Sequence, residues 1–364
     1  MAPKFVVMIS DVFSKPSKAM REAMANADVE DSMVLALEAK CAKLLGKEKA
    51  LLVSSGTMGN LLCVMGHCQE RGQEVLMGDK SHLYLSEQGH VAQLAGVFPR
   101  SVPTLKDGTH DLTTLAETIS TSGVTGECRT KVICLENTHN RCGGKILPLD
   151  YLQKLYNLAQ ENDIKVHVDG ARILNAAVGL GVPVSEITKF CDSVTFCLNK
   201  GIGAPFGSIV AGTESFIKRV RRCRKALGGE MRQLGMEAAA GLYGLDGAEE
   251  TLQKDHFLAK KLVNGLKSLS SSVVTIEPEE DQTNLVFIKI DKEMSFITNL
   301  TERLMTTTEA EVKELGKEIR VGCKLWGKDI RFAICCNNNE EDIDDAIKKV
   351  CYVLRKFISE IIKD

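Results

Sequence analysis

A lysine and an acid each follow an apolar, strand-like run in this sequence. Lys200 comes after residues 192–196 and enters a glycine-rich turn at 201–205, and Asp169 ends the run at 164–168. Because the carboxyl ends of parallel strands meet at one sheet edge, we expect both side chains to face one crevice. A lysine amine can form an imine, and an acid can hold a pyridine nitrogen protonated. The pair therefore predicts a pyridoxal phosphate enzyme, with Lys200 and Asp169 catalytic.

A turn of small residues at 53–60 follows an apolar run and opens a helical pattern. Without bulky side chains, its backbone N–H groups can approach a phosphate, to which the helix N-terminus adds a favourable partial charge. Gly56 permits that approach, and Thr57 can add a hydroxyl donor. The turn predicts a cofactor phosphate site, although a Ser/Thr helix cap with tight-turn glycines gives the same pattern.

Two arginines stand where an anion could be bound. Arg172 follows Asp169 by one short turn, so it can bind the cofactor phosphate or a substrate carboxylate. A surface arginine beside a capping aspartate is the alternative. Arg331 lies inside a strand-like run, where an arginine is costly unless it is paired. A substrate carboxylate would pair it, as would an acid of the chain itself.

Two histidines and two basic residues complete the candidate site. His82 and His139 each follow a strand-like run. An imidazole there can stack on a flat cofactor or exchange protons with a substrate, although a lone histidine is more often a hydrogen-bonded core or loop residue. Lys225 and Arg232 flank a glycine hinge after a basic run at 218–225. The run predicts a solvated helix face, and the hinge suits a phosphate supplied by a neighbouring subunit.

Composition sets the class of protein. The chain has 364 residues with 44% hydrophobic and 26% charged side chains, which is typical of a soluble globular protein with more than one core. A net charge of −2 favours neither nucleic acid nor a membrane as a partner. Thirteen cysteines without a CxxC pair predict buried, reduced thiols and no metal site. The apolar start is too short for a signal peptide, so we expect a cytoplasmic protein.

The order of the predicted elements defines an α/β fold. Strands alternate with helices over the first two-thirds, which predicts a large domain with a mostly parallel central sheet flanked by helices. A small C-terminal α+β domain follows. We predict an N-terminal arm at 1–25, without a strong core pattern in its first twenty residues, a large cofactor-binding domain at 26–252 and a small domain at 253–364. The predicted strands are 50–53, 74–77, 131–135, 165–168, 193–196, 208–210, 273–276, 284–290 and 330–334, and helices are predicted at 59–68, 149–160, 232–243 and 341–362.

Four long motifs, in this order, resemble those of one family. They lie at 54–60, 135–140, 167–172 and 192–201, and the segment 224–233 adds a fifth match. The chain closely resembles the low-specificity L-threonine aldolases, pyridoxal phosphate enzymes of the aspartate-aminotransferase-like fold. The similarity runs from about residue 10 to 246 and, more weakly, to Arg331. It implies a lyase that splits L-threonine, L-allo-threonine and related β-hydroxy-α-amino acids into glycine and an aldehyde.

The resemblance also implies a role for each candidate residue. Lys200 would be the Schiff-base lysine, and Asp169 would pair with the pyridinium nitrogen. His82 would stack on the ring, and His82 and His139 are the candidates for handling the β-hydroxyl proton. Gly56, Thr57 and Arg172 would hold the cofactor phosphate or the ring oxygen. Ser10, Arg172 and Arg331 would bind the substrate carboxylate. Lys225 and Arg232 would come from an adjacent subunit of a homodimer or homotetramer.

The sequence departs from the family at the rim of the expected pocket. Members usually carry Gly-Asp-Asp-Val-Tyr-Gly-Glu-Asp-Pro after the N-terminal arm, where this chain has only residues 29–34, and Ser86 replaces an aromatic residue. The rim predicts an altered substrate preference. Another reaction on a small amino acid, such as β-elimination, racemisation or transamination, remains an alternative. A catalytically silent relative is a third reading, against which the intact Lys200 and Asp169 both speak.

Overall fold

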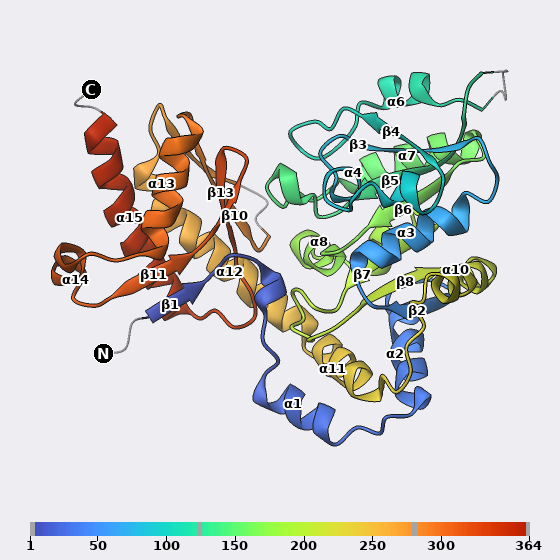
Figure 1. Ribbon diagram of the computed structural model, residues 1–364, viewed down its shortest axis with the longest axis horizontal. Coiled ribbons are helices and arrows are strands. Elements are labelled where there is room, and N and C mark those ends of the chain that lie inside the picture. The colour runs from blue at the N-terminus through green and yellow to red at the C-terminus, as the bar shows by residue number, and fades with distance from the viewer. Residues whose placement is uncertain (1–3, 122–125, 279–282, 362–364) are drawn as a thin grey trace. The chain divides into compact units, whose positions relative to one another are not determined.

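The chain folds into two units (Figure 1), and the computed structural model describes residues 4–121, 126–278 and 283–361. Residues Pro16–Glu249 form the large unit. The described residues up to Lys15, together with those from Glu250 onward, form the small unit. Each unit has its own hydrophobic core, and each is described by itself below.

A seven-stranded sheet forms the centre of the large unit, with the strand order β2-β8-β7-β6-β5-β3-β4. Neighbours from β7 to β4 pair parallel, and β8 pairs antiparallel with both β7 and β2. The prediction of a mostly parallel sheet is therefore confirmed. The strands are β2 Lys49–Val53, β3 Gln73–Gly78, β4 Phe98–Val102, β5 Arg129–Glu136, β6 Lys165–Asp169, β7 Ser193–Cys197 and β8 Ser208–Gly212.

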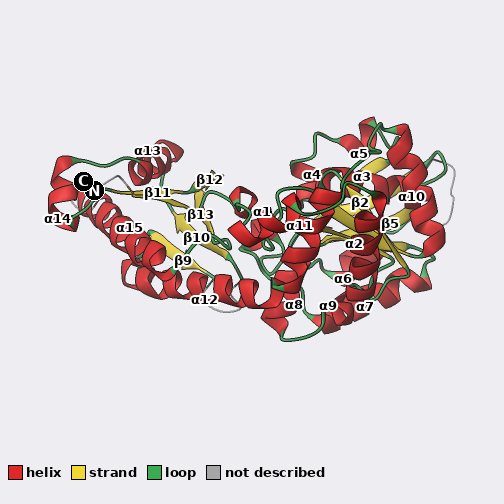
Figure 2. Ribbon diagram, turned by 90° about the horizontal axis from the view of Figure 1, so that it is seen from below, coloured by secondary structure: helices red, strands yellow, loops and turns green. Residues whose placement is uncertain are grey.

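Helices cover both faces of this sheet (Figure 2). Every residue of β3, β7 and β8 is buried, because apolar cores form on either side of the strands. The helices are α1 Lys18–Ala25, α2 Asp31–Leu44, α3 Gly56–His67, α4 His82–Leu85, α5 His90–Gln93, α6 Leu112–Thr118, α7 Leu149–Glu161, α8 Ile173–Leu180, α9 Val184–Thr188, α10 Glu214–Ala226 and α11 Gly235–Asp246. α12, Ala248–Leu266, lies almost wholly in the small unit.

The predicted strands of the large unit are confirmed within a few residues, but β4 is not among them, and several helices, including α2, α8 and α9, were not predicted. β4 was missed because it is an edge strand that contains Pro99, which breaks a strand pattern. α11 was predicted from residue 232 and begins at Gly235. A Cβ atom on Gly235 would lie 1.8 Å from the Asp28 carbonyl oxygen, so the backbone at Asp28 packs directly on the first turn of α11.

The small unit is an α+β structure with two sheets. Its larger sheet is antiparallel, in the order β12-β13-β10-β9, and β1 pairs parallel with β11. Its elements are β1 Lys4–Val7, β9 Val274–Glu277, β10 Leu285–Ile290, α13 Met294–Met305, α14 Glu309–Leu315, β11 Ile319–Gly322, β12 Lys324–Trp326, β13 Asp329–Ala333 and α15 Glu340–Ile361. No helix in the described part of the chain is long and apolar enough to span a membrane.

The expectation that the first twenty residues lack a core pattern is wrong. Val6 and Met8 are 1% and 0% exposed and belong to the core of the small unit. β1 was missed because its partner is remote in sequence: Lys4 pairs with Ile319.

Candidate active site

Two acids and a lysine lie at the carboxyl ends of three neighbouring parallel strands of the large unit. Glu136 ends β5 and Asp169 ends β6, and these two residues are partners in the register between the strands. β7 lies beside β6 and ends at Cys197, just before Lys200. The Lys200 carbonyl accepts a hydrogen bond of 2.9 Å from Gly203 N–H, which closes the turn. The topology thus brings Lys200 and Asp169 to the same edge of the sheet, as predicted.

Asp169 is a buried carboxylate with two hydrogen bonds. Its Oδ2 accepts from Asn60 Nδ2 at 3.0 Å, and its Oδ1 accepts from Ala171 N–H at 3.1 Å. Burial raises the pKa of Asp169 from 3.8 to about 6. Nearby charges act in both directions: two carboxylates add to the rise, and two basic groups oppose it, namely Glu136 and Glu87 against His82 and Lys200.

His82 lies beside this carboxylate. A ring nitrogen of His82 and carboxylate oxygens of Glu87 and Asp169 all lie within 4.8 Å of one another. The backbone N–H of His82 donates to Glu136 Oε2 at 2.7 Å, which fixes the start of α4, and its ring Nδ1 lies 2.7 Å from Glu87 Oε1. The hydrogen bond to Glu87 raises the pKa of His82, against the opposing effect of burial.

The predicted phosphate turn is the beginning of α3. Ser55 caps this helix by accepting from Met58 N–H at 3.1 Å, and Thr57 is exposed on the first turn. A Cβ atom on Gly56 would lie 3.0 Å from Cys197 Sγ, so the turn packs against the end of β7, close to the turn that holds Lys200. Backbone N–H groups at a helix N-terminus are therefore presented next to the strand ends.

Substitution of Gly59 tests how closely α3 must approach the sheet. A Cβ atom at this position would lie 2.7 Å from Thr195 Cγ2 in β7. Alanine improves helix propensity by about 1 kcal/mol, yet overpacking costs about 1 to 3 kcal/mol, so we expect Gly59→Ala to lower the free energy of unfolding by up to about 2 kcal/mol. Chemical denaturation measures this change. Gly247→Ala is the control, because a Cβ atom there meets nothing within 4 Å; equal effects of the two substitutions would refute the steric argument.

Arg172 and His139 are both buried near these strand ends. Arg172 is 7% exposed and precedes α8, shortly after Asp169. His139 is 2% exposed, and within the described residues its Nδ1 has no hydrogen-bond partner. Burying a polar atom without a partner costs about 1 to 3 kcal/mol. A ligand atom would remove this cost, so the His139 ring is suited to contact one.

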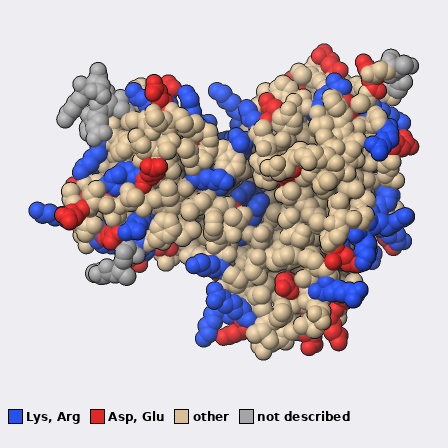
Figure 3. Space-filling view, in the orientation of Figure 1, with Lys and Arg blue, Asp and Glu red and all other residues tan. Residues whose placement is uncertain are grey.

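Lys225 and Arg232 lie on the surface of the large unit, unlike the buried residues at the strand ends. Lys225 forms an ion pair with Glu230, and Arg232 is exposed between α10 and α11. The basic run forms most of α10, and Arg221 pairs with Glu38. In Figure 3 basic side chains gather at the right-hand edge, where α10 lies in Figure 1, with acidic ones beside them. The interpretation of this run as a solvated helix face is therefore confirmed for much of its length.

Ser10 and Arg331 come together in the small unit. Arg331 lies in β13, is 2% exposed and donates from Nη2 to the Ile9 carbonyl at 3.1 Å. Its guanidinium carbon is 4.7 Å from the centroid of the Trp326 ring, a cation–π distance. Ser10 directly follows Ile9 and caps a short 3-10 helix. The position of Arg331 within a strand is therefore confirmed, and a backbone carbonyl and an aromatic ring are among its partners.

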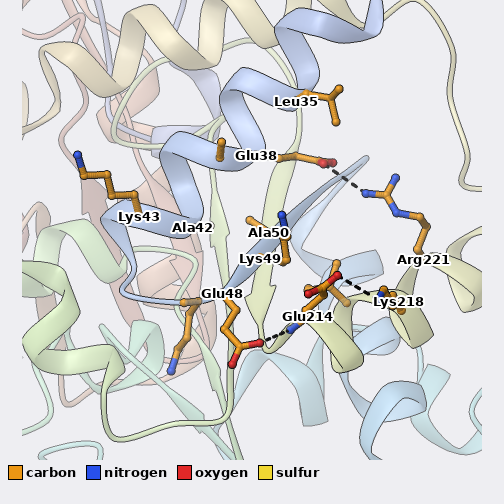
Figure 4. A pocket seen from close by; sticks show the side chains of 13 residues that line it. Leu35, Glu38, Ala42, Lys43, Glu48, Lys49, Ala50, Glu214, Lys218 and Arg221 are labelled. Atoms are coloured by element: carbon orange, nitrogen blue, oxygen red, sulfur yellow. Dashed lines mark hydrogen bonds and ion pairs between the residues drawn. The ribbon is translucent and has the colours of Figure 1, made fainter.

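A surface pocket of about 490 Å³ lies elsewhere in the large unit, between α2, β2 and α10 (Figure 4). It contains none of the predicted site residues. Basic residues outnumber acids in its lining, and two of the acids form ion pairs there: Glu38 with Arg221 and Glu214 with Lys218. The strand ends that carry Lys200 and Asp169 lie outside this pocket, and we assign the pocket no role.

Sequence reasoning missed the polar residues that surround Asp169 and His82. Glu87, Asn60 and Glu136 are 3%, 1% and 6% exposed, respectively. An acid or amide with so little exposure needs a polar partner, and each of these has one on the site. Only Glu136 carried a signal in the sequence, since it ends an apolar strand as Asp169 does.

The comparisons with known proteins define the class. Residues 8–293 match the family model of the beta-eliminating lyases, and the chain belongs to this family. Among its relatives is low-specificity L-threonine aldolase 1 of Arabidopsis thaliana, which is 43% identical over 80% of this chain and 83% of the relative. The low specificity L-threonine aldolase of Escherichia coli (strain K12) is 41% identical over 78% of this chain and 84% of the relative.

Solved structures agree on the fold. The threonine aldolase of Leishmania major superimposes with a TM-score of 0.75 at 15% identity, over 96% of this chain and 99% of that one. Together these matches confirm the predicted resemblance to the low-specificity L-threonine aldolases and the predicted α/β fold.

Proposed function

We propose that this protein is a pyridoxal phosphate-dependent aldolase that cleaves L-threonine, L-allo-threonine and related β-hydroxy-α-amino acids into glycine and an aldehyde. The observation that carries the proposal is the placement of Lys200, Asp169 and His82 at neighbouring strand ends of the large unit. Two relatives that share more than 40% of the matched residues are named low-specificity L-threonine aldolases.

The residues present fit the cofactor. The first turn of α3 offers backbone donors for a phosphate beside Thr57. A side chain at position 56 would crowd Cys197, and glycine avoids that contact. Asp169 suits a pyridine nitrogen, because a cationic partner would offset the burial that raises the pKa of its carboxyl. Arg172 is our candidate for the phosphate or the ring oxygen. When bound, pyridoxal phosphate supplies an electron sink for the carbanion left after the carbon–carbon bond breaks.

The side chains of the chain itself would perform the remaining tasks. Ser10, Arg172 and Arg331 are our candidates for gripping the substrate carboxylate, which would set the Cα–Cβ bond in the orientation that cleaves. His82 and His139 would contact the ring face and the β-hydroxyl group, where one of them removes a proton. Lys200 would hold the cofactor through its amine and yield it to the amine of the substrate.

Assembly and location follow as further parts of the proposal. Lys225 and Arg232 are exposed, so a partner subunit could place them at its own phosphate site. We therefore propose a homodimer or homotetramer with shared active sites. None of the thirteen cysteines, all of which lie in the described part of the chain, is in a disulfide, which suits a reducing compartment and supports a cytoplasmic protein.

Another reaction of the same cofactor is the second candidate. Ser86, which stands where the family has an aromatic residue, is exposed at the end of α4, directly after the exposed Tyr84 and Leu85. The expected long rim segment at 29–34 is short, and α2 already begins at Asp31. A changed rim would alter which bond of the substrate is aligned for cleavage.

The experiment that tests the proposal is an assay of the purified protein with pyridoxal phosphate and the four threonine stereoisomers. We expect glycine and acetaldehyde in equal amounts from one or both L-isomers. Formation of 2-oxobutanoate would favour elimination, and formation of the isomer inverted at Cα alone would favour racemisation. A protein that binds no cofactor would refute both candidates.

A further inference from the structure

Glu87 is a buried acid with three hydrogen-bond donors and no assigned role. Its Oε1 accepts from His82 Nδ1 at 2.7 Å and from Asn60 Nδ2 at 3.0 Å. Its Oε2 accepts from His90 Nε2 at 2.5 Å. Burial would raise the pKa of Glu87, but the hydrogen bonds from His82 and His90 outweigh it and lower that pKa to about 2. Glu87 is therefore a fixed negative charge beside His82.

Asn60 connects this charge to the second acid of the site. The same amide nitrogen that donates to Glu87 also donates to Asp169 Oδ2 at 3.0 Å. Asn60 comes from α3, whereas Asp169 comes from the end of β6. One amide therefore holds two carboxylates at set positions, and each of them faces His82.

A chain of buried hydrogen bonds fixes the orientation of that amide. Its oxygen lies 3.2 Å from His167 Nε2, and His167 Nδ1 lies 2.9 Å from Ser193 Oγ. Ser193 Oγ lies 2.7 Å from His67 Nε2. Burial lowers the pKa of both histidines, that of His167 to about 4, so both rings are neutral near pH 7.

The donor of each hydrogen bond in this buried series can be assigned by elimination. The Asn60 amide gives both of its protons to carboxylates, so its oxygen must accept from His167 Nε2–H. A neutral His167 then accepts at Nδ1 from the Ser193 hydroxyl, whose oxygen accepts from His67 Nε2–H. Every donor points toward Asp169 and Glu87. If the Asn60 amide were turned the other way, its oxygen would face two carboxylates. The hydrogen bond from His167 prevents that orientation.

We propose that Glu87 is a positioning residue of the active site: it holds the His82 ring by Nδ1 and, through Asn60, shares a fixed geometry with Asp169. The inference rests on the proposed function, because His82 and Asp169 would have a catalytic purpose only if they contact the cofactor. Held by Nδ1, His82 keeps its ring plane fixed and its Nε2 available for the substrate. Glu87 also favours the protonated ring, because its carboxylate accepts a hydrogen bond from Nδ1.

The groups that face His82 come from several elements. Glu136 from β5, Asp169 from β6 and Glu87 before α5 all raise its pKa, and burial lowers it. Lys200, after β7, acts on the neighbouring Asp169. Of these three acids Glu87 contributes the leading effect, because its side chain is hydrogen-bonded to the ring.

The test follows the titration of His82 itself, by NMR of the ¹³C- and ¹⁵N-labelled imidazoles in the cofactor-free protein. In the wild type we expect a pKa above the ordinary value of 6.5. In Glu87→Gln we expect that pKa to fall, because the fixed charge is gone while the burial remains. Affinity for pyridoxal phosphate should weaken about tenfold, the equivalent of one hydrogen bond near the upper end of its net contribution.

Glu74→Gln is the matched control. Glu74 is also a buried glutamate, 0% exposed, but it lies at the amino end of β3, where it pairs with Arg100 and accepts from Thr130. The Glu74→Gln substitution should leave the pKa of His82 unchanged. A wild-type His82 that titrates at or below its ordinary value would overturn the proposal without any variant, as would an unshifted titration in a folded Glu87→Gln. If the wild type shows the raised pKa but binds no pyridoxal phosphate, the proposed function fails while the hydrogen-bonding role of Glu87 stands.

Discussion

Lys200→Ala is expected to lower kcat/KM for threonine cleavage by on the order of 10⁴-fold or more and to remove the cofactor-dependent visible absorbance. The reason is covalent: alanine has no amine to hold the cofactor or to yield it to the substrate. Lys200 lies in a turn after β7 that is closed by backbone hydrogen bonds, including Gly203 N–H to the Lys200 carbonyl and Ala204 N–H to the Leu198 carbonyl. These bonds do not involve the side chain, so the fold should be unchanged.

The measurements are a steady-state assay, an absorbance spectrum with added pyridoxal phosphate, and a thermal melt. Lys189→Ala is the control, because Lys189 is also a lysine of the large unit but is 51% exposed and pairs with Glu186. It should keep both activity and absorbance. If Lys200→Ala kept the wild-type absorbance, another amine would hold the cofactor and the assignment of Lys200 would be wrong.

The positions that could be predicted from sequence are those fixed by local pattern. Apolar runs revealed β5, β6 and β7, and polar residues directly after such runs gave Asp169 and Lys200. Parallel strands bring such residues together by topology alone, so no contact had to be known in advance. The same logic located the beginning of α3, because small residues between a strand and a helix form a turn of limited variety.

The missed residues depend on contacts between segments far apart in the chain. Asn60 lies on an apolar helix, where it looks like a tolerated polar residue, until its amide is seen to touch Glu87 and Asp169. Glu87 lies in a short polar segment that resembles any surface loop, yet it is 3% exposed. Burial of a polar side chain is a property of the folded chain, and for Asn60 and Glu87 the sequence pattern gives no sign of it. The hydrogen-bond network was therefore beyond prediction, although its members are ordinary residues.

Asp169→Asn is expected to lower kcat by on the order of 10²- to 10³-fold, because an amide cannot hold a pyridine nitrogen protonated. The same substitution separates function from stability. The pKa of Asp169 is raised from 3.8 to about 6, so between these values the folded protein binds more protons than the unfolded chain. A carboxyl with a raised pKa lowers the stability of the cofactor-free protein as pH increases, which is opposite to the usual behaviour of an acid.

The difference in unfolding free energy between wild type and Asp169→Asn should therefore change with pH. Going from below pH 4 to pH 7, the wild type should lose about 3 kcal/mol relative to the variant, since each unit of pKa shift is worth about 1.4 kcal/mol. Denaturation of both cofactor-free proteins across this range measures the difference. Comparing the two proteins cancels the titration of groups that they share, apart from those that interact with Asp169 directly. A constant difference would show that Asp169 has an ordinary pKa.

Bound pyridoxal phosphate should reverse the trend, because a cationic ring nitrogen beside Asp169 favours the carboxylate. The wild type should then gain more stability from the cofactor than Asp169→Asn does. A site built for this cofactor is thus destabilised without it, and the measured gain on binding reports how much of that cost the ring nitrogen offsets.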